Sequence, residues 1–209
     1  MPFESKIIFN NFNLYLWKIE ETEADLKNGI IIKSELNRKL KSIKSIEHRK
    51  RTLSIYQLIR IAGISDNDLF YNSSGAPILK SGKNISISHS KIYSGIVLSK
   101  FSVGIDIESF RKKIINISSK FLCEDENSAR GKVEELTLIW TSKEAIYKAF
   151  RTSGISFSKQ IKIDKPFSLK ETHTGKVFHN DQNKFYDLSI IKKDSHIITV
   201  ACEKILSND

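Results

Sequence analysis

A chain of 209 residues with 40% hydrophobic and 28% charged residues has the composition of a folded protein rather than a disordered one. Its net charge of +10 favours an anionic partner, which could be a nucleic acid, a membrane surface, a phosphate-rich small molecule or an acidic protein. No apolar run is long enough to span a bilayer, the amino end does not resemble a signal peptide, and Cys123 and Cys202 lack the spacing of a zinc site or a disulfide framework. A reducing, cytoplasmic location fits these features best.

The amino-terminal part predicts a strand over residues 6–19, a short helix from Thr22 and a longer helix over about 45–62, with Gly63 suited to the position after its end. Most bases of this part belong to a solvated helix face, but one or two could anchor a phosphate. The basic cluster consists of Lys33, Arg38, Lys39, Lys41, Lys44, Arg49, Lys50 and Arg51.

Residues 72–77 are rich in turn formers, and two strands follow over 85–90 and 93–99. The first of these strands delivers His89 to the end of a sheet. Residues 100–102 then predict a hairpin that connects to a further strand over 103–108. An isolated histidine is more often a structural, hydrogen-bonded side chain, so its position alone assigns no function.

The strand over residues 103–108 carries two carboxylates on one face. Alternation places Gly104, Asp106 and Glu108 on the face opposite the apolar residues. The Cα atoms of Asp106 and Glu108 would lie about 6.5–7 Å apart, so both carboxylates could bind one hard cation. The alternative is an edge strand whose polar face is exposed to water.

A basic connector over 111–113 precedes a predicted helix that includes Phe121 and Leu122, and the acidic run 124–126 is compatible with plain solubilising charge. A longer amphipathic helix is predicted over about 132–150. In it, Glu144 lies beside the buried stripe. It could form an exposed pair with Lys148 or act as a third, half-buried carboxylate that a metal keeps ionised.

Beyond Gly154 the pattern predicts only strands and turns, at 155–157, 161–163, 176–178, 187–191 and 197–202. The predicted fold class is α+β, with two similar lobes in one chain, each a small antiparallel sheet packed with a long helix. We expect an N-terminal lobe over 1–105 and a C-terminal lobe over 106–209.

Three motifs taken together resemble the 4′-phosphopantetheinyl transferases, in particular their larger, pseudo-dimeric class. The motifs are Ile-Ser-His-Ser at 87–90, Gly-Ile-Asp-Ile-Glu at 104–108, and Trp-x-x-Lys-Glu-Ala-x-x-Lys at 140–148. The resemblance extends from about residue 40 to residue 155. It implies an enzyme of the holo-[acyl-carrier-protein] synthase type, which moves the phosphopantetheine arm of coenzyme A to a serine of a carrier protein and releases adenosine 3′,5′-bisphosphate.

The resemblance also implies roles for individual residues. Asp106, Glu108 and Glu144 would bind Mg²⁺, with Mn²⁺ possible in its place. Glu144 would accept the proton of the attacking serine, Lys148 would stabilise or protonate the leaving phosphate, and His89 would hydrogen-bond a phosphate of coenzyme A. The implied contacts with coenzyme A come from Arg51, Gly75, Pro77, Ser88, His89, Lys143 and Lys148.

Two positions depart from the family pattern. Ala76 stands where the family usually has lysine, so a contact with coenzyme A is lost or is supplied elsewhere, for which Lys80 and Lys83 are candidates. Ser86 stands where many members have asparagine.

The resemblance implies an acidic acyl or peptidyl carrier protein as partner, with the segment 111–121 as its contact, and a monomer without nucleic acid or membrane partners. Two alternatives remain open on the residues alone. One is a basic nucleic-acid-binding module, which leaves the carboxylates and His89 unexplained. The other is a Mg²⁺-dependent pyrophosphate hydrolase, which would use the same ligands and consume coenzyme A without a carrier.

Overall fold

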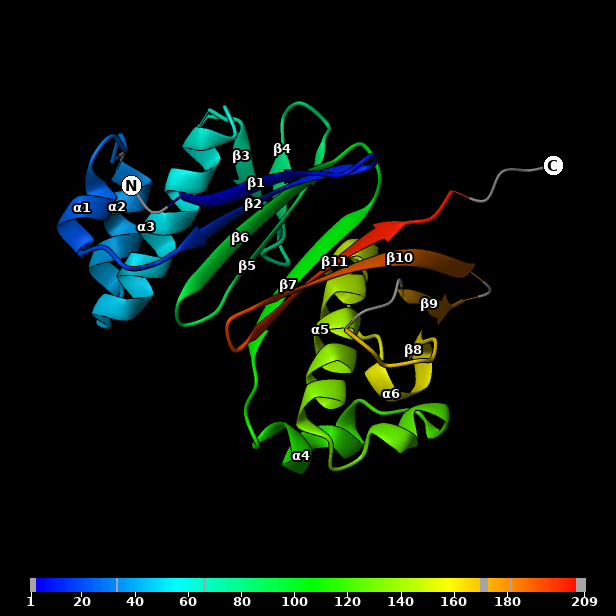
Figure 1. The fold of residues 1–209 in the computed structure, drawn as a ribbon. Coiled ribbons are helices and arrows are strands. Elements are labelled where there is room, and N and C mark those ends of the chain that lie inside the picture. The colour runs from blue at the N-terminus through cyan, green and yellow to red at the C-terminus, as the bar shows by residue number, and fades with distance from the viewer. Residues whose placement is uncertain (1–2, 33, 66, 170–172, 181, 206–209) are drawn as a thin grey trace.

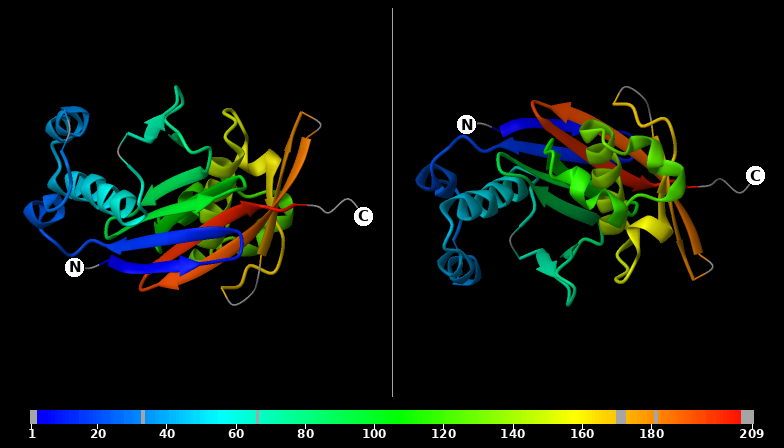
Figure 2. Two further views of the ribbon diagram at one scale, coloured as in Figure 1. Left: turned by 90° about the horizontal axis from the view of Figure 1, so that it is seen from above. Right: turned by 90° about the horizontal axis from the view of Figure 1, so that it is seen from below.

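The computed structural model describes residues 3–32, 34–65, 67–169, 173–180 and 182–205. Within these ranges it has the expected α+β architecture, with antiparallel sheets and a long helix on each of two lobes (Figure 1). The ends of the described chain lie at opposite ends of the molecule (Figure 2). None of the described helices combines the length and the apolar composition that a membrane span requires.

The first lobe is built on a four-stranded antiparallel sheet. Its order is β1 (Phe3–Ile8), β2 (Phe12–Lys18), β6 (Tyr93–Ser99) and β5 (Asn84–His89). The helices are α1 (Glu23–Lys27), α2 (Ser34–Ser42) and α3 (Ile46–Ile61), and a separate hairpin consists of β3 (Leu69–Tyr71) and β4 (Pro77–Leu79). The strand predicted over 6–19 is therefore two strands, because the polar residues 10–11 form a turn between them.

The second lobe is built on a five-stranded antiparallel sheet. Its order is β7 (Val103–Ser109), β11 (His196–Glu203), β10 (Gln182–Lys193), β9 (His173–His179) and β8 (Ile161–Ile163). The helices are α4 (Ile114–Ile117), α5 (Val133–Phe150) and α6 (Phe157–Gln160), with 3-10 turns η1 (Ser118–Lys120) and η2 (Glu124–Ala129).

Three hydrophobic clusters hold these elements in layers. One lies between α3 and the first sheet, one lies between the two sheets, and one lies between the second sheet and α5. Alternation along each strand divides the side chains between the layers: Leu14 and Leu16 of β2 face the second sheet, whereas Tyr15 and Trp17 face α3. The two sheets thus pack face to face, with a long helix on each outer face.

The connection between the lobes differs from the expectation. The hairpin predicted at 100–102 is wrong, because the chain leaves the first sheet after β6, and β7 pairs with β11 in the second sheet. The expected lobe boundary between residues 105 and 106 consequently lies within β7. The sequence of a strand does not specify its partner, so a short link between two apolar strands does not by itself indicate a hairpin.

Three further expectations are corrected. Phe121 and Leu122 follow the 3-10 turn η1 and lie in no helix. Residues 157–160 form the helix α6 in place of the end of a predicted strand. The acidic run 124–126 is not merely solubilising charge, since Glu126 is fully buried.

Candidate functional site

The candidate site lies where the two sheets meet. β5 is an edge strand of the first sheet, β7 is an edge strand of the second, and the two contact each other. The Ser86 hydroxyl accepts a hydrogen bond from the backbone N–H of Ile105 at 3.1 Å. Ser86, noted above as a departure from the family pattern, therefore joins the two strands.

Asp106 is buried at this junction, with only 6% of its surface exposed. Its Oδ1 accepts hydrogen bonds from Lys148 Nζ at 2.7 Å and from the Ser88 hydroxyl at 3.0 Å. Lys148 also donates to the backbone carbonyl of Ile105 at 3.1 Å. The structure thus brings together three predicted residues from β5, β7 and α5, and it excludes the water-exposed alternative for Asp106.

Gly104 explains how α5 comes so close to β7. A Cβ atom at Gly104 would lie 1.9 Å from the backbone carbonyl oxygen of Ala145, which no side chain can tolerate. Glycine therefore permits direct contact between helix and strand. This contact places the face of α5 that carries Glu144 and Lys148 over the carboxylate face of β7.

Glu144 is half-buried beside the other two carboxylates. Burial raises the pKa of its carboxyl group to about 7, the negative charges of Asp106 and Glu108 add to the rise, and the Lys148 ammonium opposes it. Glu108 is half-buried as well and accepts a hydrogen bond from Arg111 Nη2 at 2.9 Å. The three predicted metal ligands therefore interact electrostatically at one place.

The residues fit a hard divalent cation in their chemistry. Asp106 Oδ2 is buried and has no hydrogen-bond partner among the described residues, so one carboxylate oxygen remains available. Three clustered carboxylates are the ligands that Mg²⁺ prefers. Within the described ranges, no three acidic, histidine or cysteine side chains already stand in ligating positions, so binding by all three carboxylates together would require at least one of them to reorient.

A second group of predicted residues lies at the junction of α3 and β5. The pKa of His89 is lowered by partial desolvation and by the positive charges of Arg51, His48 and Lys148. Arg51 Nε is buried without a hydrogen-bond partner in the described part of the chain, so this donor is available. These residues form a corner suited to an anion.

The sequence interpretation missed His48. Its ring lies 6.3 Å from that of His89 between centroids. The spacing in the sequence could have indicated this position, because His48 precedes Arg51 by three residues and therefore lies on the same face of the helix.

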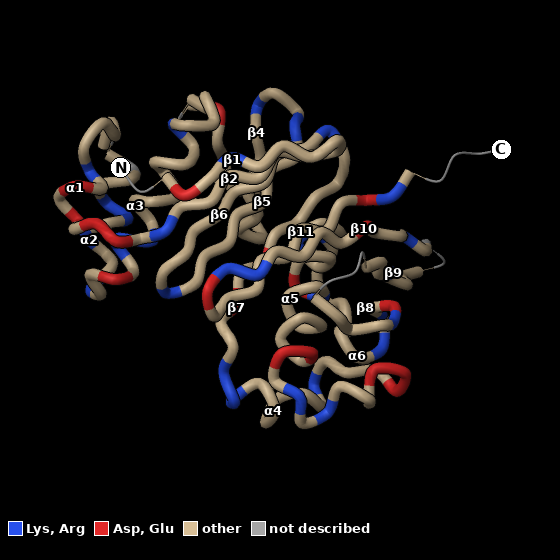
Figure 3. The backbone as a smooth tube through the Cα atoms, viewed as in Figure 1, with Lys and Arg blue, Asp and Glu red and all other residues tan. Residues whose placement is uncertain are grey.

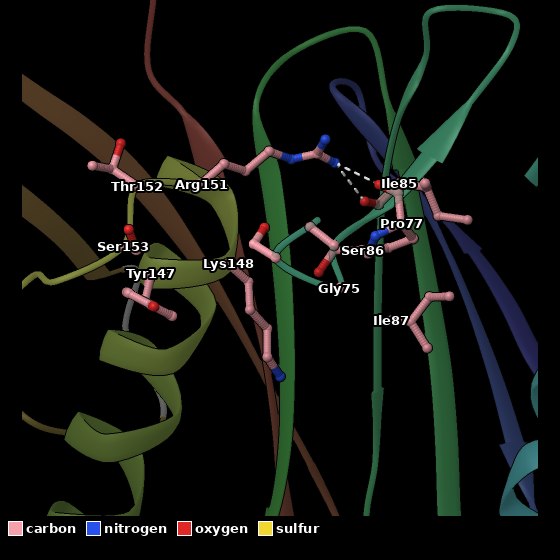
Figure 4. Close-up of a pocket in the computed structure, with 12 residues that line it drawn as sticks. Gly75, Pro77, Ile85, Ser86, Ile87, Tyr147, Lys148, Arg151, Thr152 and Ser153 are labelled. Atoms are coloured by element: carbon pink, nitrogen blue, oxygen red, sulfur yellow. Dashed lines mark hydrogen bonds between the residues drawn. The ribbon is translucent and has the colours of Figure 1, made fainter. Parts of the chain in front are cut away.

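Gly75 and Pro77 line a cavity of about 300 Å³ that Lys148 also reaches (Figure 4). Gly75 has φ of +79°, and Asn72 Oδ1 closes the turn by accepting hydrogen bonds from the N–H groups of Ser74 and Ala76 at 3.1 and 2.8 Å. The cavity is lined by Ser74, Gly75, Ala76, Pro77, Ile85, Ser86, Ile87, Tyr147, Lys148, Arg151, Thr152 and Ser153.

The structure does not bring Lys143 to this site. Lys143 is fully buried, its Nζ lies 2.7 Å from Glu126 Oε2, and it donates to the backbone carbonyls of Phe121 and Phe157. Glu126 is also fully buried and accepts from the N–H of Ile163 through Oε1. This geometry gives Lys143 a structural role in place of the predicted contact with coenzyme A.

Comparison with known proteins identifies the second half of the chain. The comparison with curated proteins finds no match to the chain. Residues 102–201, however, match the sequence model of the 4′-phosphopantetheinyl transferase superfamily, and this region contains β7, α5 and therefore Asp106, Glu144 and Lys148. Residues 102–201 are therefore similar to the 4′-phosphopantetheinyl transferase superfamily.

Proposed function

We propose that the protein transfers the 4′-phosphopantetheine group of coenzyme A to a serine of an apo acyl or peptidyl carrier protein and releases adenosine 3′,5′-bisphosphate. The superfamily match supports a phosphopantetheinyl transferase. The observation that carries the specific proposal is the meeting of Asp106, Lys148 and Glu144 beside a cavity that Lys148 also lines.

Asp106, Glu108 and Glu144 would hold Mg²⁺, with Mn²⁺ as a possible substitute. The available oxygen Asp106 Oδ2 and the three carboxylates support this assignment. When bound, the ion would neutralise the pyrophosphate of coenzyme A and act as a Lewis acid on it.

The chain's own residues account for the movement of the proton and the leaving group. The serine oxygen forms a bond to the phosphorus that bears the pantetheine arm, and the bond from this phosphorus to the bridging oxygen breaks. Glu144 accepts the serine proton, a role that its pKa of about 7 suits near neutral pH. Lys148 donates a hydrogen bond to the departing phosphate, which it reaches from its position between Asp106 and the cavity.

The remaining contacts with coenzyme A divide between two places. Arg51 and His89 would bind the 3′-phosphate, and the free Nε donor of Arg51 supports this assignment because guanidinium groups bind phosphate through paired donors. Gly75 and Pro77 would line the cavity for another part of the molecule, next to Ser88 and Lys148.

The two lobes in one chain support the larger, pseudo-dimeric class and a monomer, since the residues of β5 and those of α5 complete the site without a second subunit. Figure 3 shows basic segments on both lobes, including the connector after β7. This charge supports an acidic carrier protein as partner.

The carrier would dock on the segment 111–121. Next to Glu108 this segment borders a groove of about 230 Å³ that combines the bases Arg111 and Lys113 with the apolar Ile114 and Ile117. An acidic helix with an apolar stripe would complement both properties.

The test is incubation of the protein with Mg²⁺, coenzyme A and a panel of apo carrier proteins, followed by intact-mass measurement of each carrier. We expect a phosphopantetheine adduct with the wild type, its loss in Glu144→Gln, and its retention in Glu135→Gln, a matched change in the first turn of the same helix. If coenzyme A does not bind and no carrier is modified, the proposal is wrong.

The same experiment separates the hydrolase alternative, which shares the predicted carboxylates. A pyrophosphate hydrolase would release adenosine 3′,5′-bisphosphate from coenzyme A in reactions that lack a carrier. A transferase releases it only when the carrier is present.

A further inference from the structure

Arg151 has an unusual backbone for its residue type. It follows the last residue of α5 with φ of +58° and ψ of +23°, in the left-handed region, and its N–H donates to the carbonyl of Tyr147 at 3.1 Å. Glycine is the usual residue at such a helix end because any Cβ atom adds strain there. The backbone conformation at position 151 therefore does not explain the presence of arginine, and the reason has to lie in the contacts of its side chain.

That side chain reaches the first lobe. Arg151 Nη2 donates to the carbonyl oxygen of Ile85 at 2.8 Å and to that of Pro77 at 3.2 Å (Figure 4). Ile85 lies on the edge strand β5 and Pro77 begins β4. One guanidinium nitrogen thus holds the turn of residues 74–77 and the start of β5 to the end of α5.

The same guanidinium contributes charge to the cavity. Of the twelve lining residues, Lys148 and Arg151 are cationic and none carries a carboxylate. Lys148 forms an ion pair with Asp106, whereas both hydrogen bonds of Arg151 go to neutral carbonyls, so its positive charge is not balanced by them. The cavity is therefore suited to an anionic ligand.

Arg151 also provides a cation near Ala76, which stands where the family usually has lysine. Lys80 and Lys83, the candidates from the sequence, do not line this cavity; Lys80 Nζ instead lies over the ring of Phe70 at 5.1 Å. Arg151 lines the same cavity as Ala76 and donates a hydrogen bond to the carbonyl oxygen of Pro77, the residue after Ala76.

We infer that Arg151 is a positioning and binding residue for coenzyme A, which holds the 74–77 turn against α5 and supplies from the helix the cation that Ala76 does not supply from the turn. This inference rests on the proposed function. Because neither Arg51 nor His89 lines the cavity, Arg151 acts on a part of coenzyme A other than its 3′-phosphate.

The first experiment compares wild type, Arg151→Gly, Arg151→Lys and the double variant Arg151→Gly/Ala76→Lys by calorimetric titration with coenzyme A and by transfer kinetics. We expect Arg151→Gly to raise the Kd and the KM for coenzyme A by about tenfold, because a charge-assisted contact is lost, with a smaller change in kcat. Arg151→Lys should keep part of the affinity. In the double variant, Ala76→Lys should restore most of the affinity that Arg151→Gly loses. Glycine suits the backbone at position 151, so the first variant should fold at least as well as wild type.

The second experiment identifies the part of coenzyme A that Arg151 serves. Arg151→Gly should weaken coenzyme A and 3′-dephospho-coenzyme A by the same factor, whereas Arg51→Ala should weaken coenzyme A only. Arg130→Ala removes an exposed arginine that is not part of the cavity lining, and it controls for the loss of net charge.

The possible failures are distinguishable. If wild type binds coenzyme A and modifies a carrier while Arg151→Gly binds equally well, the inference about Arg151 is wrong and the proposed function stands. If Arg151→Gly binds coenzyme A more weakly but the added Ala76→Lys substitution restores no affinity, Arg151 does not act through its charge. Only its hydrogen bonds to the carbonyls of Pro77 and Ile85 then contribute to binding. If wild type binds no coenzyme A, the proposed function and this inference are both wrong.

Discussion

Lys148 Nζ lies 2.7 Å from Asp106 Oδ1, so the chain neutralises its most buried site carboxylate with a cation of its own. This pair crosses from α5 to β7. A substrate phosphate or a divalent cation that enters the site therefore competes with an interaction that the protein already makes.

Replacing Lys148 with Met should lower stability and change the response to Mg²⁺. The substitution leaves the charge of Asp106 without its main partner, and we expect a loss of about 2 kcal/mol in the free energy of unfolding. Mg²⁺ should then raise the melting temperature more in Lys148→Met than in wild type, because the ion would supply the missing positive charge. The melting temperatures of both proteins are measured in Mg²⁺ and in excess chelator. An equal rise with Mg²⁺ in both proteins would contradict the prediction. Transfer activity should fall by about 100-fold.

Lys143 and Glu126 should behave as a structural pair. Removing one partner leaves a fully buried charge without compensation, so Lys143→Met or Glu126→Gln should each cost about 3–5 kcal/mol. The double variant Lys143→Met/Glu126→Gln should cost less than the sum of its two single substitutions. Urea unfolding of all four proteins gives the coupling energy. An increase in the KM for coenzyme A in Lys143→Met without a loss of stability would instead support a direct contact with the substrate.

The carboxylate strand and the long helix were predictable because each has a strong local pattern. Alternation over residues 103–108 placed Asp106 on the correct face, and the apolar stripe of residues 133–150 gave α5 nearly to the residue. These patterns depend only on the geometry of a strand and a helix.

The structural roles of Lys143 and Arg151 were not predictable from such patterns. Lys143 lies next to Glu144 in the sequence, yet successive helix residues point about 100° apart, and Glu126, which pairs with it, is seventeen residues earlier. Arg151 contacts residues 66 and 74 positions away, which only the packing of the two lobes brings near. Pairing between distant segments was the missing information in both cases, as it was for β7 and β11.

Gly104 and Gly75 should respond differently to replacement by alanine. At Gly104 the new methyl group would collide with the backbone of α5, so we expect a loss of about 3 kcal/mol or more and a displaced helix. At Gly75 nothing lies within 4 Å of the added Cβ, and only the left-handed backbone is strained, at a cost of about 1 kcal/mol. Chemical denaturation measures both. Equal costs would show that close helix packing does not depend on position 104.

The raised pKa of Glu144 makes the stability of the chelator-treated protein depend on pH. The folded-state pKa of about 7 lies above the usual value of 4.5, so the folded protein binds an additional proton between these values. The stabilising contribution of the protonated carboxyl is complete below about pH 4.5 and is lost as the pH rises through 7. Glu144→Gln lacks this loss, and at pH 8 it should be more stable than wild type by an amount on the order of 2 kcal/mol.

Urea unfolding of both proteins from pH 4.5 to 8 in chelator measures this difference. It should be small at the acidic end and largest above neutrality, and Mg²⁺ should reduce it at pH 8, because the ion would favour the ionised carboxylate of wild type only. Glu135→Gln, which removes a carboxylate from the first turn of the same helix, controls for the general effect of the substitution. A difference between wild type and Glu144→Gln that does not change with pH would mean that neither burial nor the charges of Asp106 and Glu108 raise the pKa of Glu144. The shared carboxylate site that both the metal assignment and the general-base role require would then be absent.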